Sequence, residues 1–266
     1  MLPTLFISHG SPDIAIAETP ATAFLRQLAA SLPRPRAIVV ASAHFEAEGG
    51  VFVTGDDHPE TIHDFGGFAR ELHEMRYPAP GDPALADEIV AELASAGFPA
   101  KVAKGRGFDH GAWVPLILAY PEADIPVVEV SIDPRRDAAY HHGLGRALAG
   151  LSRRNVLVVG SGSLTHNLRE AFPNLRAGRR QAEVPQWVEA FADWMGARLA
   201  AGDLEALLDY RRRAPYAREN HPTDEHLMPF YVALGAAADG AAAEMLHRSR
   251  DCGVLAMEAF AFRQAA

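Results

Sequence analysis

The fold of this sequence is decided by the stretch Ala37-Ile38-Val39-Val40-Ala41-Ser42-Ala43-His44, a continuous apolar run that ends in a histidine. Such a run is typical of a central strand that helices cover on both faces. Residues 4–7 and 155–159 form two further apolar runs, which lead toward His9 and His166. The pattern therefore predicts several buried strands whose histidines meet at one edge of a sheet.

The order of segments along the chain indicates the fold class, which we predict to be α/β. Helical patterns alternate with expected strands over residues 3–8, 36–44, 99–103, 125–132 and 155–160. We expect a single domain over residues 1–266, with a central, mostly parallel or mixed β-sheet flanked by helices on both faces. Open sheets of this kind bind ligands at the carboxyl edge of their strands, which is where we place a metal site.

The later part of the chain is expected to be mostly helical. A helix should start near Leu164, and the polar region over residues 172–184 reads as a mobile or lid-like segment. Amphipathic patterns predict helices over residues 185–201 and 224–238. The run over residues 253–262 predicts a strand that closes the chain.

Composition and charge exclude several classes of protein. Hydrophobic residues make up 48% of the chain and charged residues 22%, so a packed core is expected rather than disorder. The net charge of -9 and the lack of a basic run argue against nucleic acid as a partner. No run of ~18 apolar residues is present, and the first residues lack the pattern of a signal peptide. The single cysteine, Cys252, excludes a disulfide framework and fits a cytoplasmic location.

Histidines that follow apolar runs suggest a metal site. His9 and His44 each come at the end of an expected strand, and His226 comes at the start of an expected helix. Neutral imidazole binds zinc and iron, and a catalytic metal keeps three protein ligands with an open position. The neighbouring Ser8 and Ser42 could orient the imidazoles. A single buried histidine is more often a hydrogen-bonded core residue, but three at strand ends favour a shared metal.

A loop over residues 55–68 combines aromatic residues with a carboxylate, a histidine and a glycine pair. This composition makes the loop a candidate wall of the site, while an ordinary loop with a tight glycine bend explains it equally well. Phe65, Phe68 and Trp113 could pack against an aromatic ring. The alternative is that these three residues belong to the core.

Two familiar motifs are present only in part. Residues 160–165 follow an expected strand and contain two glycines, but the third glycine of a dinucleotide-binding loop is missing. Ser161 does not lie in a Gly-x-Ser-x-Gly elbow, so a serine hydrolase is disfavoured. We therefore expect no nucleotide cofactor.

The chain resembles the class III extradiol ring-cleavage dioxygenases of the LigB-like superfamily, in the 4,5-DOPA extradiol dioxygenase-like branch. The resemblance covers nearly the whole chain. It rests on the segments at residues 8–12, 37–44, 62–68, 77–81, 107–113, 166–169 and 222–226, which include Ser8-His9-Gly10-Ser11-Pro12 and Pro222-Thr223-Asp224-Glu225-His226.

The resemblance implies a role for five histidines, and the identity of the third metal ligand differs between branches of the superfamily. His9, His44 and His226 match metal ligands, and His166 matches an acid/base residue at the metal's edge that some members use as a further ligand. His110 matches a second catalytic histidine that contacts substrate. Other branches use a glutamate as third ligand, which would be Glu225 here, but the DOPA-type branch uses a histidine. The cofactor implied is one divalent metal per chain, Zn(II) or Fe(II).

The activity implied is insertion of both atoms of O2 into a catechol-type substrate, with ring opening. The partners implied are a small aromatic diol and O2, and we expect a monomer or a small homo-oligomer. A zinc-dependent hydrolase or lyase that uses zinc-bound water is the alternative enzyme. A binding protein without activity is a third possibility, because a fold does not fix a function. The loops over residues 46–68 and 170–184 are expected to set the choice of catechol.

Overall fold

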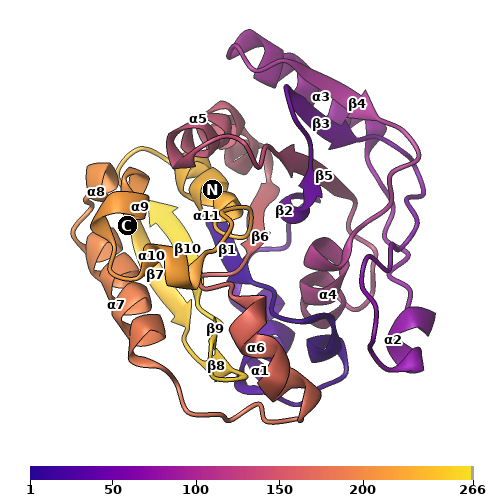
Figure 1. The fold of residues 1–266 in the computed structure, drawn as a ribbon. Coiled ribbons are helices and arrows are strands. Elements are labelled where there is room, and N and C mark those ends of the chain that lie inside the picture. Colours follow the sequence, from indigo (N-terminus) through magenta and orange to yellow (C-terminus); the bar gives the residue numbers. More distant parts are fainter. Residues whose placement is uncertain (265–266) are drawn as a thin grey trace.

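The computed structural model describes residues 1–264, which are built around an eight-stranded mixed β-sheet with the strand order β4-β3-β5-β2-β6-β1-β10-β7 (Figure 1). Its strands are β1 (Thr4–Ser8), β2 (Ala37–Glu46), β3 (Val51–Thr54), β4 (Ala100–Ala103), β5 (Val127–Ile132), β6 (Val156–Gly162), β7 (Ala241–His247) and β10 (Ala259–Gln264). The central strands β5, β2, β6 and β1 are parallel, and β10 and β7 continue the sheet in antiparallel pairing. At the opposite edge, β3 is antiparallel to β5 and parallel to β4. The predicted α/β domain with a mixed sheet is confirmed.

Strand β2 shows why the apolar run at residues 37–44 is central. Side chains alternate between the two faces of a strand. Ile38 and Val40 enter the core on one face of the sheet, while Val39 and Ala41 enter the core on the other. Because all four side chains are buried, β2 requires helices on both faces.

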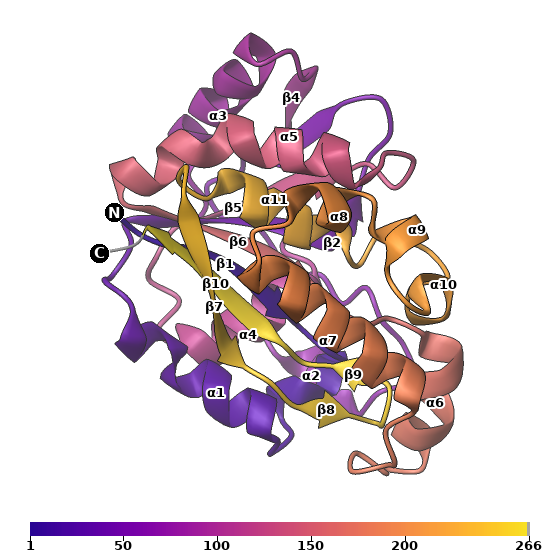
Figure 2. The ribbon, with the colours of Figure 1, turned by 90° about the vertical axis from the view of Figure 1, so that its left-hand side faces the viewer.

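Helices cover the sheet on both sides (Figure 2). One face carries α3 (Pro83–Ser95), α5 (Ala138–Leu148) and α11 (Met228–Ala236), and the other carries α1 (Pro20–Leu28) and α4 (His110–Ala119). Helix α7 (Gln186–Ala200) packs against β7. The smaller elements are α2 (Arg70–Glu74), α6 (Leu168–Arg176), α8 (Leu204–Leu208), α9 (Tyr210–Arg213), α10 (Ala217–Asn220), β8 (Arg250–Asp251), β9 (Leu255–Ala256) and 3₁₀ turns at residues 12–15, 29–31 and 149–154.

The late segments depart from the prediction. Helix α6 starts at Leu168, not near Leu164, because the Asn167 side chain accepts from the Glu170 N–H and caps the helix there. The first part of the region expected to be lid-like is thus helical. The helix expected over residues 224–238 is shortened to α11, and strand β7 follows it where no strand was predicted.

The closing strand is also shorter than predicted. The run over residues 253–262 is divided between β9 and β10, and Cys252 and Gly253 turn the chain with φ of 51° and 79°. The alanines that begin β7 favour a helix locally, but pairing with β10 holds them in a strand. Tertiary pairing here overrides local propensity.

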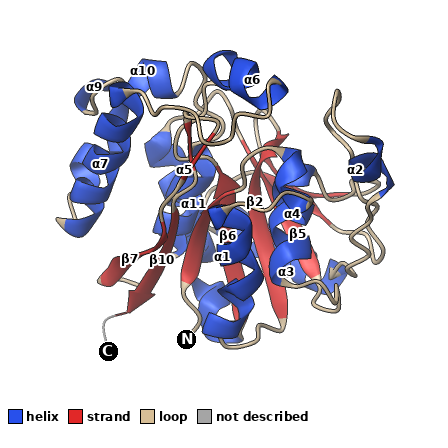
Figure 3. Cartoon of the chain, turned by 90° about the horizontal axis from the view of Figure 1, so that it is seen from below, coloured by secondary structure: helices blue, strands red, loops and turns tan. Residues whose placement is uncertain are grey.

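The carboxyl ends of the parallel strands meet at one edge of the sheet. Figure 3 shows α6 and α10 beyond this edge, while the chain termini lie at the opposite edge. Among the helices of residues 1–264, none has the length and apolar character needed to cross a membrane.

Candidate metal centre

Five histidines gather at the carboxyl edge of the sheet. His9 directly follows β1, His44 lies near the end of β2, and His110 is the first residue of α4. His166 lies between β6 and α6, and His226 lies just before α11. All five line one cavity. The sequence placed His226 at the start of a helix over residues 224–238, whereas the structure places it in the turn that precedes α11.

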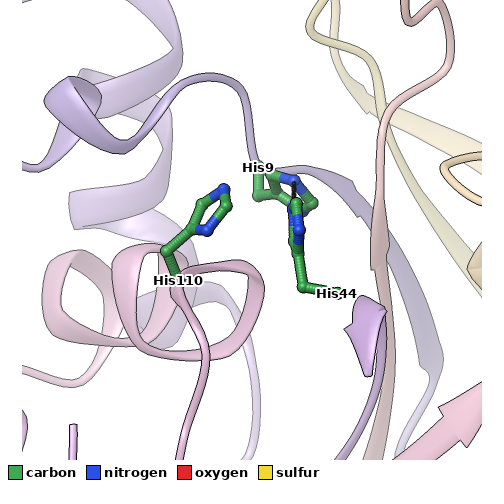
Figure 4. A group of neighbouring side chains, drawn as sticks. All are labelled: His9, His44 and His110. Carbon is green, nitrogen blue, oxygen red and sulfur yellow. Dashed lines mark hydrogen bonds between the residues drawn. The ribbon is translucent and has the colours of Figure 1, made fainter. Parts of the chain in front are cut away.

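The Nε2 atom of His44 contacts the Nε2 atoms of two other histidines. The Nε2 of His44 lies 3.1 Å from the Nε2 of His9 and 3.3 Å from the Nε2 of His226. Two groups of donors in the described chain have the geometry to hold a metal ion, His9 with His44 and His110, and His166 with Glu225 and His226. Figure 4 shows the first group, in which His110 faces His44 from α4. Because His44 contacts both groups, the two form one continuous cluster.

Oxygen atoms behind the imidazoles fix their tautomers. The Glu225 carboxylate lies 2.9 Å from the Nδ1 of His226, so that Nδ1 carries the hydrogen and donates a hydrogen bond to the carboxylate. The Nδ1 of His9 lies 3.0 Å from the Ser161 hydroxyl, which itself donates to the Gly111 carbonyl. Ser161 therefore accepts from His9. In both histidines the Nε2 atom is left with its lone pair directed at His44.

Sequence reasoning missed Ser161 as the partner of His9. The expectation that Ser8 and Ser42 orient the imidazoles is wrong. The Ser8 hydroxyl accepts from the Leu164 N–H, and the Ser42 hydroxyl donates to Asp109 at 2.6 Å. Ser8 is adjacent to His9, and neighbouring side chains in a strand point to opposite faces. Ser42 lies two residues before His44, and its hydroxyl accepts from the backbone N–H of His44 rather than from the ring.

Asp64 supports two other histidines. Its carboxylate lies 2.9 Å from the Nδ1 of His110 and 3.6 Å from the Nδ1 of His44. It also accepts a hydrogen bond from the backbone N–H of His110. Burial by itself would raise the pKa of Asp64, but the contacts with His110 lower it to about 2. A charged carboxylate therefore stands behind both imidazoles. The sequence identified this loop as a wall of the site without assigning Asp64 a partner.

Four histidines of the cluster, His9, His44, His166 and His226, are held in the neutral form. Burial, together with the neighbouring histidines, lowers the pKa of His9 and of His226 well below 6.5. Burial likewise lowers the pKa of His44 to about 4 and that of His166 to about 3. Neutral imidazoles with free lone pairs are the form that binds a metal.

The ring of His166 packs against His226, at the side of the cluster. Its ring stacks on that of His226 with centroids 3.4 Å apart, and its Nδ1 lies 3.8 Å from Glu225. Burial keeps the pKa of His166 at about 3, below the near-neutral value that suits an acid/base residue. His221 is buried and its Nε2 contacts the Leu164 carbonyl, so it supports the fold.

The cavity in front of the histidines has a volume of about 280 Å³ and mostly apolar walls. Phe65 and Phe68 from the 55–68 loop line it, as does the apolar face of α6. Trp113 does not line it, because its ring is buried in the core and its Nε1 donates to the Ile62 carbonyl. Of the three aromatic residues expected near a substrate ring, Phe65 and Phe68 line the cavity and Trp113 belongs to the core.

Two glycines of β6 explain the partial dinucleotide motif. A Cβ atom on Gly162 would lie 2.1 Å from the His226 carbonyl oxygen, and one on Gly160 would lie 2.0 Å from the Pro229 carbonyl oxygen. The glycines therefore let the segment that carries His226 pack directly on β6. The same contact supplies the hydrogen bond from the Ser163 N–H to the His226 carbonyl.

The family of the chain follows from comparison with known proteins. A family model described as the catalytic LigB subunit of aromatic ring-opening dioxygenase matches residues 3–261. The chain belongs to this family of aromatic ring-opening dioxygenases, as its motifs predicted.

Individual relatives agree with the family. A Beta vulgaris protein named 4,5-DOPA dioxygenase extradiol is 41% identical over 263 residues, which cover 97% of this chain and 96% of that protein. An Escherichia coli (strain K12) protein of the same name is 41% identical over 239 residues, covering 88% of this chain and 85% of that protein. A crystal structure of an uncharacterized Escherichia coli K12 protein matches with a TM-score of 0.78 and 32% identity, covering 98% of this chain and 100% of that one.

Proposed function

We propose that this enzyme opens the ring of a catechol-type substrate with O2, beside the diol, at a metal held by His9, His44 and His226. The single observation that carries the proposal is that the Nε2 atom of His44, in an apolar cavity, lies within 3.3 Å of the Nε2 atoms of both His9 and His226. Neutral nitrogen lone pairs that face one another repel, and a cation between them removes that repulsion. Family membership favours the ring-opening reaction over the zinc-dependent hydrolase that the sequence left open.

The donor set fits a divalent transition metal. Bonds of about 2.0–2.1 Å from a tetrahedral metal to imidazole nitrogens place those nitrogens about 3.3 Å apart. The observed separations of 3.1 and 3.3 Å lie close to that value. Ser161 and Glu225 hold the rings from behind, as partners of metal-bound histidines do.

The active metal in this proposal is Fe(II). When bound, ferrous iron supplies the redox chemistry that joins O2 to the diol, whereas zinc has no redox chemistry. The three imidazoles bind zinc equally well. A protein that carries zinc is therefore expected to be folded and inactive.

His166 and His110 handle the protons of the diol. His166 is neutral and lines the cavity, so it can accept a proton from a substrate hydroxyl. A negatively charged diolate beside it raises its pKa toward neutrality and stabilises the proton there. Asp64 accepts from the backbone N–H of His110 and lies 2.9 Å from its Nδ1, which keeps the imidazole facing His44. It can then hydrogen-bond an oxygen of the substrate.

The cavity favours a substrate with one aromatic ring. A volume of about 280 Å³ lies just below the usual range for ligand sites, about 300–1,000 Å³. Phe65 and Phe68 offer apolar surface to the ring. The names of the relatives from Beta vulgaris and Escherichia coli favour a DOPA-like catechol. A cytoplasmic location is in keeping with a buried single cysteine, Cys252, and with ferrous iron.

Elemental analysis and O2 uptake together test this proposal. The protein is loaded with Fe(II) under anaerobic conditions and mixed with a panel of catechols, including DOPA. We expect O2 uptake with a yellow, ring-opened product, and we expect His9→Ala to lose both metal and activity. His58→Ala is the matched control, because His58 is an exposed loop histidine. Stoichiometric iron without O2 uptake on any catechol would refute the proposal.

A further inference from the structure

A second cavity adjoins the one that contains the histidines. The inner cavity has a volume of about 280 Å³ and the outer cavity a volume of about 650 Å³. Four residues line both cavities, namely Gly66, Phe68, Phe172 and Leu175. A Cβ atom on Gly66 would meet no atom within 4 Å, so this part of the shared rim is open. A substituent on a ring in the inner cavity therefore has room to extend into the outer one.

The two cavities differ in charge. Apart from the histidines, Asp64 is the one ionisable residue that lines the inner cavity. The outer cavity is lined by Asp13, Arg176 and Arg180. Arg180 is neutralised, because its guanidinium forms ion pairs with Asp13 and Asp251. Among residues 1–264 no carboxylate forms an ion pair with Arg176, so its positive charge is available to a ligand.

Arg176 is held close to the shared rim. It is the last residue of α6, and its guanidinium lies over the Phe172 ring, 5.6 Å from the centroid. Arginine over an aromatic face is a favourable arrangement that restricts the side chain. Because Phe172 lines both cavities, this contact keeps the free charge beside the passage between them.

We propose that Arg176 selects catechols whose ring substituent ends in a carboxylate. The diol lies at the histidines, the substituent passes Phe172, and the guanidinium binds the carboxylate. This inference rests on the proposed ring-opening function. Arg176 is exposed, so it contributes to binding the substituent and takes no part in the chemistry at the ring.

A matched pair of ligands isolates the charge. The probes are 3-(3,4-dihydroxyphenyl)propanoate and its neutral primary amide, which have nearly the same size. We expect Arg176→Gln to weaken binding of the acid roughly five- to tenfold and to leave binding of the amide unchanged. Arg176→Lys should restore most of the preference. Arg179→Gln is the control, since Arg179 is an exposed arginine three residues away that lines neither cavity.

Two measurements keep this inference separable from the proposed function. Calorimetry on the zinc-loaded protein gives the dissociation constant of each probe without turnover, and O2 uptake by the iron-loaded protein gives KM and kcat. A change in KM for the acid alone, with kcat constant, supports the role of Arg176. Equal effects on acid and amide, or no effect on either, overturn it. Failure of the proposed function would instead appear as absent O2 uptake by the wild-type protein, while calorimetry still reports the charge preference.

Discussion

The Glu225 carboxylate lies 2.9 Å from the Nδ1 of His226 and so directs the Nε2 lone pair of that ring into the histidine cluster. The resemblance implied that His226 is the third metal ligand, with Glu225 as the alternative that other branches use. The geometry favours a division of roles, in which His226 binds the metal and Glu225 holds the imidazole from behind. Partners of this kind typically contribute 10- to 100-fold to metal affinity.

Replacing Glu225 tests this division. Glu225→Gln removes the charge behind His226 while keeping the size of the side chain. We expect metal affinity to fall about tenfold to 100-fold, measured by competition with a chelator. Glu170→Gln on the exposed side of α6 is the control. Complete loss of metal binding, as severe as in His9→Ala, would indicate that Glu225 is itself a ligand.

A methyl group at Gly162 should displace His226. The added Cβ would lie 2.1 Å from the His226 carbonyl oxygen, and backbone atoms on both sides leave little room to adjust. We expect Gly162→Ala to lose at least tenfold in metal affinity and about 2 kcal/mol in unfolding free energy. Gly150→Ala should be neutral, because a Cβ at Gly150 meets no atom within 4 Å. Normal metal binding by Gly162→Ala would show that the segment tolerates the shift.

Removing the imidazole of His166 should separate catalysis from metal binding. His166→Gln keeps a polar side chain beside His226 but cannot take up a proton. We expect kcat to fall about 100-fold or more while the iron content stays near one per chain. Parallel measurements of O2 uptake and iron content decide the question. If iron is lost together with activity, His166 acts as a further ligand.

Stability should fall in weak acid because of a histidine remote from the cluster. The buried His141 donates from Nδ1 to the Asp137 carbonyl and accepts at Nε2 from the Asp133 N–H. Burial lowers its pKa from 6.5 to about 4. As the pH falls below 6.5, the unfolded chain takes up a proton at His141 that the folded protein does not, so stability is lost progressively until about pH 4.

Urea unfolding of the metal-free protein measures this effect. Between pH 7 and pH 5 the wild-type protein should lose about 2 kcal/mol more than His141→Gln, which has no imidazole to protonate. The exposed His58 provides the control variant His58→Gln, whose pH dependence should match that of the wild type. Parallel pH dependence of the wild type and His141→Gln would contradict the assignment.

The sequence predicted those features that depend on local pattern. The apolar runs identified β2 and β6. The histidines that end β1 and β2 were expected at one edge of the sheet, and the structure brings His9 and His44 into contact there.

What the sequence missed depends on pairing between distant segments. Ser161 reaches His9 because β6 lies beside β1 with Ser161 opposite Ile7, and no local pattern contains that register. Strand β7 exists because β10 pairs with it. The sequence likewise could not predict that Arg176 lines a cavity, because that cavity is formed by α6 together with distant segments.

The three proposed ligands lie far apart in the chain, because His226 follows His9 by 217 residues. During synthesis, a ribosome must therefore make this whole stretch before a metal can bind all three proposed nitrogens. If these histidines hold the metal, a shortened product that lacks His226 keeps the first ligands but cannot complete the set. A bound ion stabilises only a fold that contains all three ligands. Supply of the metal would therefore protect complete chains from proteolysis more than shortened chains.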